Sequence, residues 1–275
     1  MRVAVLTALA MLAFAGNSLL CRLALRDTGI DAATFTSVRL ASGALMLAVI
    51  LVARRVRPTS GGSWPMAAML FAYAAFFSFA YRDLTAATGA LLLFGSVQLS
   101  MMGWALVKGE RLGGFRLLGL AIALGGLVWL LLPGLSAPPL LAATLMIGAG
   151  IAWAVYSVLG RSAGEPIAGT GGNFVRAVVF AAALSLAAMN HVSLDRTGAL
   201  YAVLSGALTS GLGYVLWYAA LPALSTASAA IVQLSVPAIA TVGGALLLGE
   251  TIGLRVLVAS AAILGGIALT IRRNS

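Results

Sequence analysis

The chain has 275 residues, of which 61% are hydrophobic and only 9% are charged. A soluble domain carries roughly 45–50% apolar and about 25% charged residues, so this composition excludes a water-soluble fold and predicts an all-α membrane protein. The net charge of +10 would suit nucleic acid. The basic residues, however, stand singly or in short groups between apolar runs, as charges at membrane borders do. We therefore expect the lipid bilayer, and no nucleic acid, as a partner.

Ten membrane-spanning helices are predicted by the uncharged runs, because a span needs about 20 apolar residues. Prolines and charges divide the longer runs, as around Pro133 and Pro222. The first run also fits a secretory signal with Ala13-Phe14-Ala15 as its cleavage site, an alternative that the repeat below argues against. The expected helices are 3–21, 32–53, 64–81, 85–107, 116–132, 140–160, 171–189, 197–220, 225–248 and 254–271.

The two halves of the chain repeat one another. Residues 109–126 (GERLGGFRLLGLAIALGG) recur as 249–266 (GETIGLRVLVASAAILGG), with Gly-Glu at the start and Gly-Gly at the end of both. Residues 13–22 likewise match 152–161. We divide the chain into a first repeat at 1–132, a linker at 133–139 and a second repeat at 140–275. An odd number of helices per repeat makes the second copy enter the membrane inverted, which is typical of secondary transporters.

The distribution of Lys and Arg predicts that both termini are cytoplasmic. The cytoplasmic ends would hold ten basic residues, namely Arg2, Arg54, Arg55, Arg57, Lys108, Arg111, Arg116, Arg161, Arg272 and Arg273. The opposite ends would hold five, namely Arg22, Arg26, Arg82, Arg196 and Arg255.

The acidic residues argue against several mechanisms. All seven fall at helix ends or in loops, namely Asp27, Asp31, Asp83, Glu110, Glu165, Asp195 and Glu250. A carboxylate at the bilayer centre would mark a proton relay or a cation site, so the pattern disfavours a bare cation as substrate. The sequence contains no nucleotide-binding or hydrolase motif. We expect no enzyme activity, no cofactor and no metal site, and an intramembrane enzyme or a receptor is the disfavoured alternative.

Polar and aromatic side chains within the predicted spans are the candidates for substrate binding. Neutral polar groups in hydrocarbon need a partner, and aromatic groups at helical spacing suit an apolar ligand. Interhelical hydrogen bonding and ordinary packing are the alternative roles. The candidates are Asn17, Tyr73, Phe77, Phe94, Gln98, Trp153, Tyr156, Thr209, Tyr214 and Gln233.

Three further residues are candidates for gating. Arg39 and Arg176 are charges within spans, and we expect Arg39 to pair with Asp27 or Asp31 at one face and Arg176 with Glu165 at the other. Snorkelling to a helix end is the alternative. Pro237 is expected in the middle of the ninth helix, where it would act as a bending point or as a tolerated kink.

The sequence resembles the drug/metabolite transporter superfamily in its ten-helix form with two EamA-type domains. The resemblance covers nearly the whole chain and is carried by 109–126 with 249–266, by 14–22 with 153–161, by Arg39 and by 218–237. It is similar in particular to bacterial inner-membrane exporters of aromatic amino acids. That resemblance implies export of an amino acid, aromatic or otherwise apolar, through a cavity enclosed by helices 1–4 and 6–9. A broad drug or metabolite exporter is the alternative, and a monomer is the expectation.

Overall fold

The computed structural model describes residues 2–57, 61–109, 113–134, 137–160, 165–224 and 232–271. Within these ranges the chain is helical, and α8, η2 and α9 follow one another as one continuous rod. The elements are α1 (Arg2–Asp27), α2 (Ala32–Ala53), α3 (Trp64–Tyr81), α4 (Ala86–Val107), α5 (Gly114–Leu131), α6 (Leu140–Gly160), α7 (Pro166–Ala187), η1 (Met189–His191), α8 (Arg196–Leu204), η2 (Ser205–Leu212), α9 (Gly213–Ala220), η3 (Leu221–Ala223), α11 (Ser235–Leu248) and α12 (Leu254–Ile271).

These helices are built for a bilayer. Seven helical segments are long and apolar enough to cross a membrane, and Trp64–Ala80, Ser235–Leu248 and Leu254–Leu269 are shorter apolar helices. Large apolar side chains such as Leu45, Leu140 and Leu246 are more than 60% exposed on the outside of the bundle. Such a surface is stable against lipid and not against water. The chain is therefore a multi-pass, all-α membrane protein.

The predicted helix bounds agree with the structure at 32–53, 64–81, 140–160 and 254–271. The seventh helix begins earlier than expected, because the Glu165 side chain accepts a hydrogen bond from the backbone N–H of Ala168 and caps α7. Pro237 is the third residue of α11, and the helical residues Val232 and Gln233 precede α11 across a turn at Leu234. In an uninterrupted helix the N–H that Pro237 lacks would bond to the Gln233 carbonyl oxygen. A role of Pro237 as a bending point stays a prediction, and residues 225–231 of this predicted helix lie outside the described residues.

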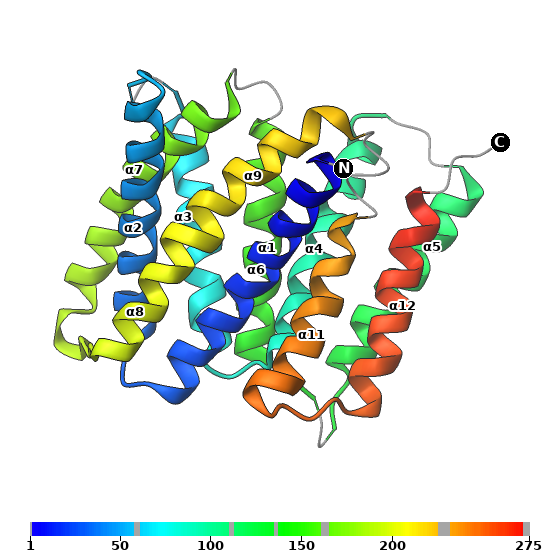
Figure 1. Cartoon of the computed structure of the whole chain (residues 1–275). Coiled ribbons are helices and arrows are strands. Elements are labelled where there is room, and N and C mark those ends of the chain that lie inside the picture. Colours follow the sequence, from blue (N-terminus) through cyan, green and yellow to red (C-terminus); the bar gives the residue numbers. More distant parts are fainter. Residues whose placement is uncertain are drawn as a thin grey trace.

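The two halves are inverted relative to one another. In Figure 1, α1 runs away from the end at which the N-terminus lies, whereas its repeat counterpart α6 runs toward that end. Helix contacts follow the same symmetry. α3 packs on α6 as the α8–η2–α9 rod packs on α1, and α4 packs on α6 as α11 packs on α1. The repeat symmetry exchanges the two members of three contacting pairs, namely α2 with α7, α4 with α11, and α5 with α12. The pseudo-two-fold axis therefore passes between the members of each pair.

The helices α5 and α12 form a pair at the edge of the bundle (Figure 1). A Cβ at Gly126 would lie 2.8 Å from Ala262, and one at Gly266 would lie 2.6 Å from the carbonyl oxygen of Gly119. The other glycine of each pair, Gly125 or Gly265, meets no atom within 4 Å. The second glycine of each repeated Gly-Gly therefore permits the close approach of the two helices, and the first does not.

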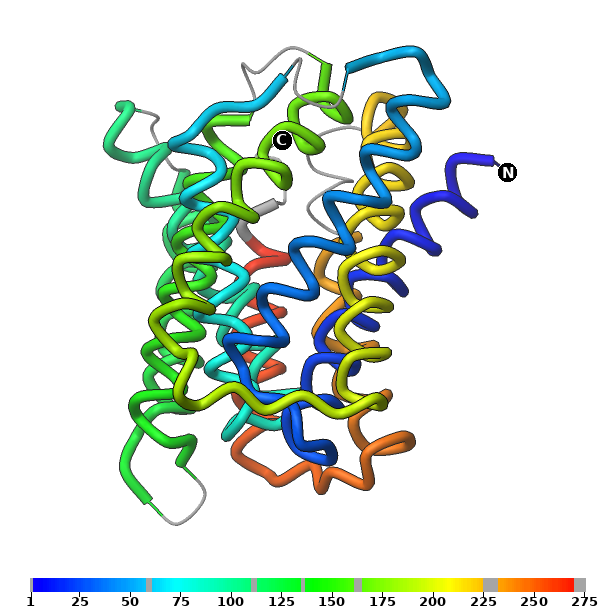
Figure 2. Tube along the Cα trace, turned by 90° about the vertical axis from the view of Figure 1, so that its left-hand side faces the viewer, coloured from blue at the N-terminus to red at the C-terminus, as the bar shows by residue number. Residues whose placement is uncertain are grey.

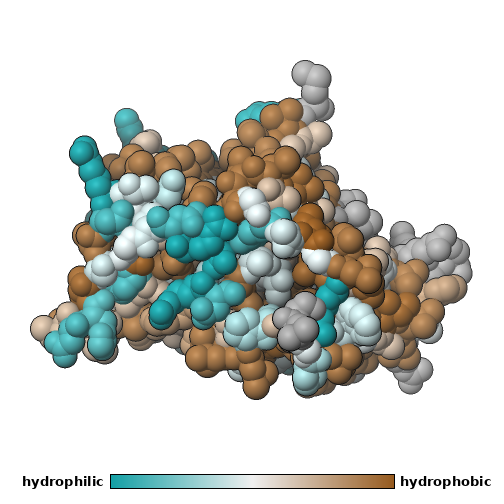
Figure 3. All heavy atoms as spheres, turned by 90° about the horizontal axis from the view of Figure 1, so that it is seen from below, coloured by the Kyte–Doolittle hydropathy of each residue, from teal (hydrophilic) through white to brown (hydrophobic). Residues whose placement is uncertain are grey.

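The two ends of the bundle can be told apart. α1 begins and α12 ends at one end, which we call the terminal end (Figures 1 and 2). The opposite, distal end carries polar side chains gathered over part of its face (Figure 3). There Arg22 Nε donates to Glu250 Oε1 at 3.0 Å, and Glu250 Oε2 accepts from the backbone N–H of Ala86 at 2.8 Å. The repeated Gly-Glu of the second half thus ties α1 to α4 and to the connection after α11, while Glu110 and Arg161 lie outside the described residues.

Candidate substrate cavity

One cavity lies inside the bundle at the junction of the two halves. Its volume is about 450 Å³, counting the part that opens to the outside. Side chains from α1, α3, α4, α6, η2 and α9 form its walls. The lining residues are Phe14, Asn17, Ser18, Tyr73, Phe77, Leu93, Phe94, Trp153, Thr209, Ser210, Tyr214 and Gln233.

Eight of the ten residues predicted to bind substrate line this cavity, and Gln98 and Tyr156 do not. Gln98 follows Phe94 by four residues, so it lies about 6 Å farther along the α4 axis and beyond the cavity wall. Tyr156 stacks on Trp153 at a centroid distance of 5.4 Å and accepts a hydrogen bond from Asn173 Nδ2 at 3.2 Å. Tyr156 therefore supports the wall from behind. A role of the other eight in binding stays a prediction.

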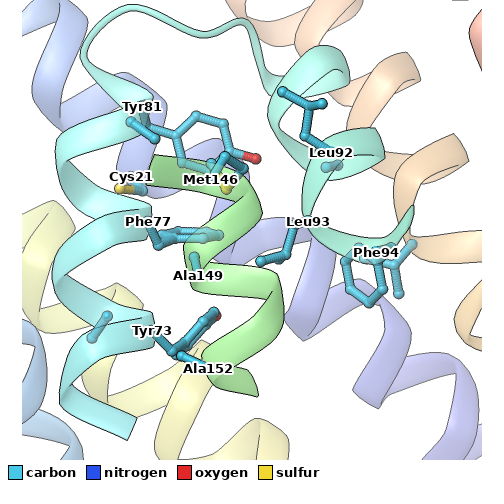
Figure 4. Close-up of a cluster of buried hydrophobic side chains, with 14 of the residues drawn as sticks. Cys21, Tyr73, Phe77, Tyr81, Leu92, Leu93, Phe94, Met146, Ala149 and Ala152 are labelled. Atoms are coloured by element: carbon cyan, nitrogen blue, oxygen red, sulfur yellow. The ribbon is translucent and has the colours of Figure 1, made fainter. Parts of the chain in front are cut away.

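Aromatic rings form one wall of the cavity. Tyr73, Phe77 and Tyr81 lie one above another along α3 and face α6, with Phe94 across from them on α4 (Figure 4). Trp153 is the hub of this wall, with its ring centroid 4.9 Å from that of Tyr73 and 5.3 Å from that of Tyr214. Small residues on α6, including Ala149 and Ala152, leave room for the rings. This wall suits an apolar or aromatic group.

A cluster of neutral polar groups forms another wall. Asn17 Oδ1 accepts hydrogen bonds from Ser205 Oγ at 2.7 Å and Thr209 Oγ1 at 3.3 Å, while Asn17 Nδ2 donates to Tyr73 Oη at 3.3 Å. Both second-half donors lie on η2, a π-helix of eight residues. π-helices widen the turn and occur mostly at functional sites. The fold thus places hydrogen-bonding groups of both repeats on one side of the cavity.

The π-helix η2 lies against α2 through glycine. A Cβ at Gly206 would collide with the Ser42 hydroxyl and the Arg39 carbonyl oxygen, and one at Gly43 would lie 2.5 Å from the Phe174 ring. Close approach of the two backbones brings Ser210 Oγ within 3.4 Å of Arg39 Nε. The Arg39 guanidinium also donates from Nη2 to Tyr73 Oη at 3.2 Å and lies over the rings of Tyr73 and Phe77. Arg39 therefore stands directly behind the cavity wall.

The predicted gate pair of Arg39 was wrong. Asp27 forms an ion pair with Arg26 instead, and Asp31 caps α2 through the backbone N–H groups of Ala33 and Thr34. Burial opposes ionisation of Asp31, but hydrogen bonds from these groups and from the Ser193 N–H hold the pKa of its carboxyl below the ordinary value. Both oxygens of the Asp31 carboxylate thus accept backbone hydrogen bonds at the distal end, and neither contacts Arg39.

The predicted partner of Arg176 was also wrong. Its Nη1 donates to the backbone carbonyl oxygens of Gly61 and Gly172, each at 2.9 Å. Glu165 is occupied as the cap of α7. Gating by Arg39, Arg176 or Pro237 stays a prediction that these contacts neither require nor contradict.

Sequence reasoning missed Phe14, Ser18, Leu93 and Ser210 as lining residues and Ser205 as the partner of Asn17. Phe14 and Ser18 lie three residues before and one after Asn17, which puts all three on one helix face. That spacing could have found them. Ser210 directly follows the predicted Thr209, whereas Ser205 could not be found in this way, because its contact with Asn17 depends on how η2 packs against α1. Among the described residues, no group of His, Cys, Asp and Glu side chains is placed to hold a metal ion.

An inverted helical repeat that encloses a cavity at the junction of its halves, in a chain with lipid-facing helices, defines the class of multi-pass membrane transporters. Residues 140–272 match the EamA-like transporter family. The chain belongs to this family.

Three comparisons with known proteins bear on this assignment. An uncharacterized protein of Pseudomonas aeruginosa is 59% identical over 98% of this chain and 94% of its own length. The threonine/homoserine exporter RhtA of Salmonella typhimurium is 36% identical over 54% of this chain, and the match spans 52% of the exporter. A crystal structure of another protein matches 98% of this chain and 96% of its own with a TM-score of 0.67 at 19% identity, which supports the fold alone.

Proposed function

We propose that this transporter exports small amino acids, apolar, aromatic or hydroxylated, across the bacterial inner membrane by alternating access of its inverted halves. The observation that carries the proposal is the cavity itself. Aromatic rings form one wall for a side chain, and neutral hydrogen-bonding groups form another for the polar end of a zwitterion. Partial similarity to RhtA, whose name states export of threonine and homoserine, supports the same class.

The topology belongs to the proposal as well. The bias of Lys and Arg puts the terminal end in the cytoplasm. A monomer suffices, because the lining residues come from both halves of one chain. The runner-up is a broad drug or metabolite exporter of the same family, which the aromatic wall would also suit. No carboxylate is among the residues that line the cavity, and this favours the amino acid over a cationic drug.

Proteoliposomes test the proposal. Vesicles that contain the purified protein are loaded with labelled L-phenylalanine, L-threonine or a cationic dye, and release is compared with that from protein-free vesicles. We expect protein-dependent release of at least one amino acid and none of the dye. Dye release without amino-acid release would establish the runner-up and overturn the proposal.

A matched pair of variants locates the path. Thr209 lines the cavity, whereas the preceding residue, Leu208, is 44% exposed on the outside of the same π-helix. Thr209→Trp fills the cavity and is expected to abolish amino-acid release, while Leu208→Trp retains it. Thermal melting of both variants in detergent shows that the protein still folds. Equal release by both variants would place the path elsewhere.

A further inference from the structure

Arg39 is a buried cation without a counter-charge among the described residues. Its exposed fraction is 1%, and no described carboxylate lies within the 4 Å of an ion pair. Glu250 is paired with Arg22 and Asp27 with Arg26, while Asp31, Glu165 and Asp195 cap helices. A charge taken out of water is strongly unfavourable unless it is paired or hydrogen-bonded. Two hydrogen bonds to hydroxyl groups and two aromatic rings compensate the charge of Arg39 only in part.

The surroundings of Arg39 have more hydrogen-bond donors than acceptors. Nη1 is buried and has no partner in the described part of the chain. Tyr73 Oη accepts from both Asn17 Nδ2 and Arg39 Nη2, so both lone pairs are used and its own O–H is left to donate. Ser210 Oγ accepts from Arg39 Nε, which likewise leaves its O–H for another acceptor. The cluster of Arg39, Tyr73 and Ser210 therefore lacks a group with several hydrogen-bond acceptors.

The spare donors face the cavity. Tyr73 and Ser210 both line it, and they are the two residues to which the guanidinium donates. The guanidinium of Arg39 therefore contacts the cavity lining through these two hydroxyl groups and through the rings of Tyr73 and Phe77. The low dielectric constant of the protein interior strengthens the electrostatic attraction between the Arg39 charge and an anionic group bound in the cavity. In addition, a guanidinium that donates a hydrogen bond to a hydroxyl oxygen makes that hydroxyl a stronger donor.

We propose that Arg39 supplies the counter-charge for a carboxylate of the transported substrate, which the hydroxyl groups of Tyr73 and Ser210 bind directly. This inference deepens the proposed function, on which it rests, by naming the group that is recognised. The transported class then consists of small carboxylates, amino acids among them. Cations without a carboxylate are rejected because the nearest buried charge repels them. Arg39 is a positioning and charge-selecting residue that acts through two hydroxyl groups.

The test compares an acid with its amide. L-Threonine and L-threonine amide differ only in the carboxylate, and their release is measured from proteoliposomes that contain the wild type, Arg39→Gln or Arg39→Lys. We expect the wild type to prefer threonine at least about tenfold, a difference of ~1.4 kcal/mol. Arg39→Gln should bring the acid-to-amide ratio close to one, and Arg39→Lys should keep a preference for the acid because it keeps the charge. An unchanged ratio in Arg39→Gln, with both substrates slowed alike, would show that Arg39 only joins helices and would overturn the inference.

A second measurement separates this inference from the proposed function. If the wild type releases no amino acid, the proposed function fails, and binding is then followed by thermal melting in detergent with sodium acetate, propionate or L-lactate against the matched amides at equal ionic strength. Carboxylate-specific stabilisation of the wild type that is lost in Arg39→Gln would support the anion site on its own. Equal effects of acid and amide on the wild type would overturn it.

Discussion

Arg39 and Arg176 occupy equivalent places in the two repeats, each after a valine in the second helix of its half, yet their surroundings differ. Arg39 is 1% exposed, has one nitrogen without a partner among the described residues and lies over two aromatic rings behind the cavity. Arg176 is partly exposed, and its Nη1 is satisfied by two backbone carbonyl oxygens. The symmetry of the fold fixes where a residue lies, and the neighbouring side chains decide whether its charge is compensated.

The cavity walls show a related difference. Both halves supply rings and hydrogen-bonding groups: Asn17 and Tyr73 from the first half, and Trp153, Tyr214 and Thr209 from the second. The buried cation behind the wall, Arg39, comes from the first half. The repeats therefore share a backbone arrangement while supplying different side chains at the junction.

The largest effect is expected from neutralising the uncompensated arginine. Arg39→Gln removes a charged donor next to the cavity, a change of ~1.5–3 kcal/mol, so we expect amino-acid release to fall roughly 10- to 150-fold. Arg176→Gln weakens only contacts near the surface and should slow release roughly threefold or less. Initial rates in proteoliposomes at matched protein density measure both. A loss in Arg176→Gln as large as in Arg39→Gln would contradict the comparison and favour a gating role for Arg176.

A compensated arginine at the distal end should hold that end closed. Glu250→Gln weakens the pair with Arg22, which is largely buried, by ~1.5–3 kcal/mol. We expect the buried Cys21 beside it to react with N-ethylmaleimide roughly tenfold faster or more. Cys21 is the single cysteine of the chain, so no background labelling has to be subtracted.

The exposed pair of Arg26 and Asp27 provides the control for this experiment. Surface pairs contribute ~0–1 kcal/mol, so Asp27→Asn should leave the labelling rate of Cys21 nearly unchanged. Equal labelling of the wild type and Glu250→Gln would show that the Arg22–Glu250 pair does not hold the distal end closed.

Where the two halves do match, substitutions should have matching effects. A Cβ at Gly126 or Gly266 overlaps the partner helix, so Gly126→Ala and Gly266→Ala are each expected to destabilise the α5–α12 pair by ~1–3 kcal/mol. Gly125→Ala and Gly265→Ala add a Cβ that meets no atom within 4 Å and should leave the melting temperature unchanged or slightly raised. A lower melting temperature for Gly265→Ala than for Gly266→Ala would mean that the register of this pair differs from the one described.

The smallest effect should distinguish two buried tyrosines. Tyr73→Phe removes the hydroxyl that lies between Arg39 and the cavity, and a loss of ~0.5–1.5 kcal/mol in substrate binding raises KM roughly 2- to 13-fold. Tyr156→Phe removes only a hydrogen bond to Asn173 behind the wall, so it should lower the melting temperature and leave KM unchanged. A change in KM for Tyr156→Phe, with none for Tyr73→Phe, would show that Tyr156 rather than Tyr73 binds the substrate.

Much of this architecture follows from the sequence, because an apolar environment leaves few alternatives. Runs without charge must span the bilayer, which is why the bounds of α2, α3, α6 and α12 could be predicted. Polar groups such as Asn17 and Thr209 must turn away from lipid, which is why they could be placed inside.

The parts that could not be predicted depend on contacts between helices. The partners of Arg39 follow from how closely Gly206 lets η2 approach α2, and no local pattern encodes that distance. The contacts of Ser205 and Ser210 likewise depend on how η2 packs against α1 and α2. The helix predicted over 225–248 was expected to be continuous, whereas its described part has a turn at Leu234 just before α11.

Counterflow of a labelled amino acid is the sharpest test of alternating access through this cavity. Proteoliposomes are preloaded with unlabelled L-threonine or L-phenylalanine and diluted into a trace of the labelled compound, with no ion gradient. A carrier that exposes one central site to each side in turn exchanges substrate, so we expect a transient accumulation of label that Thr209→Trp abolishes. Uptake that never exceeds that of protein-free vesicles, for every amino acid tried, would contradict it.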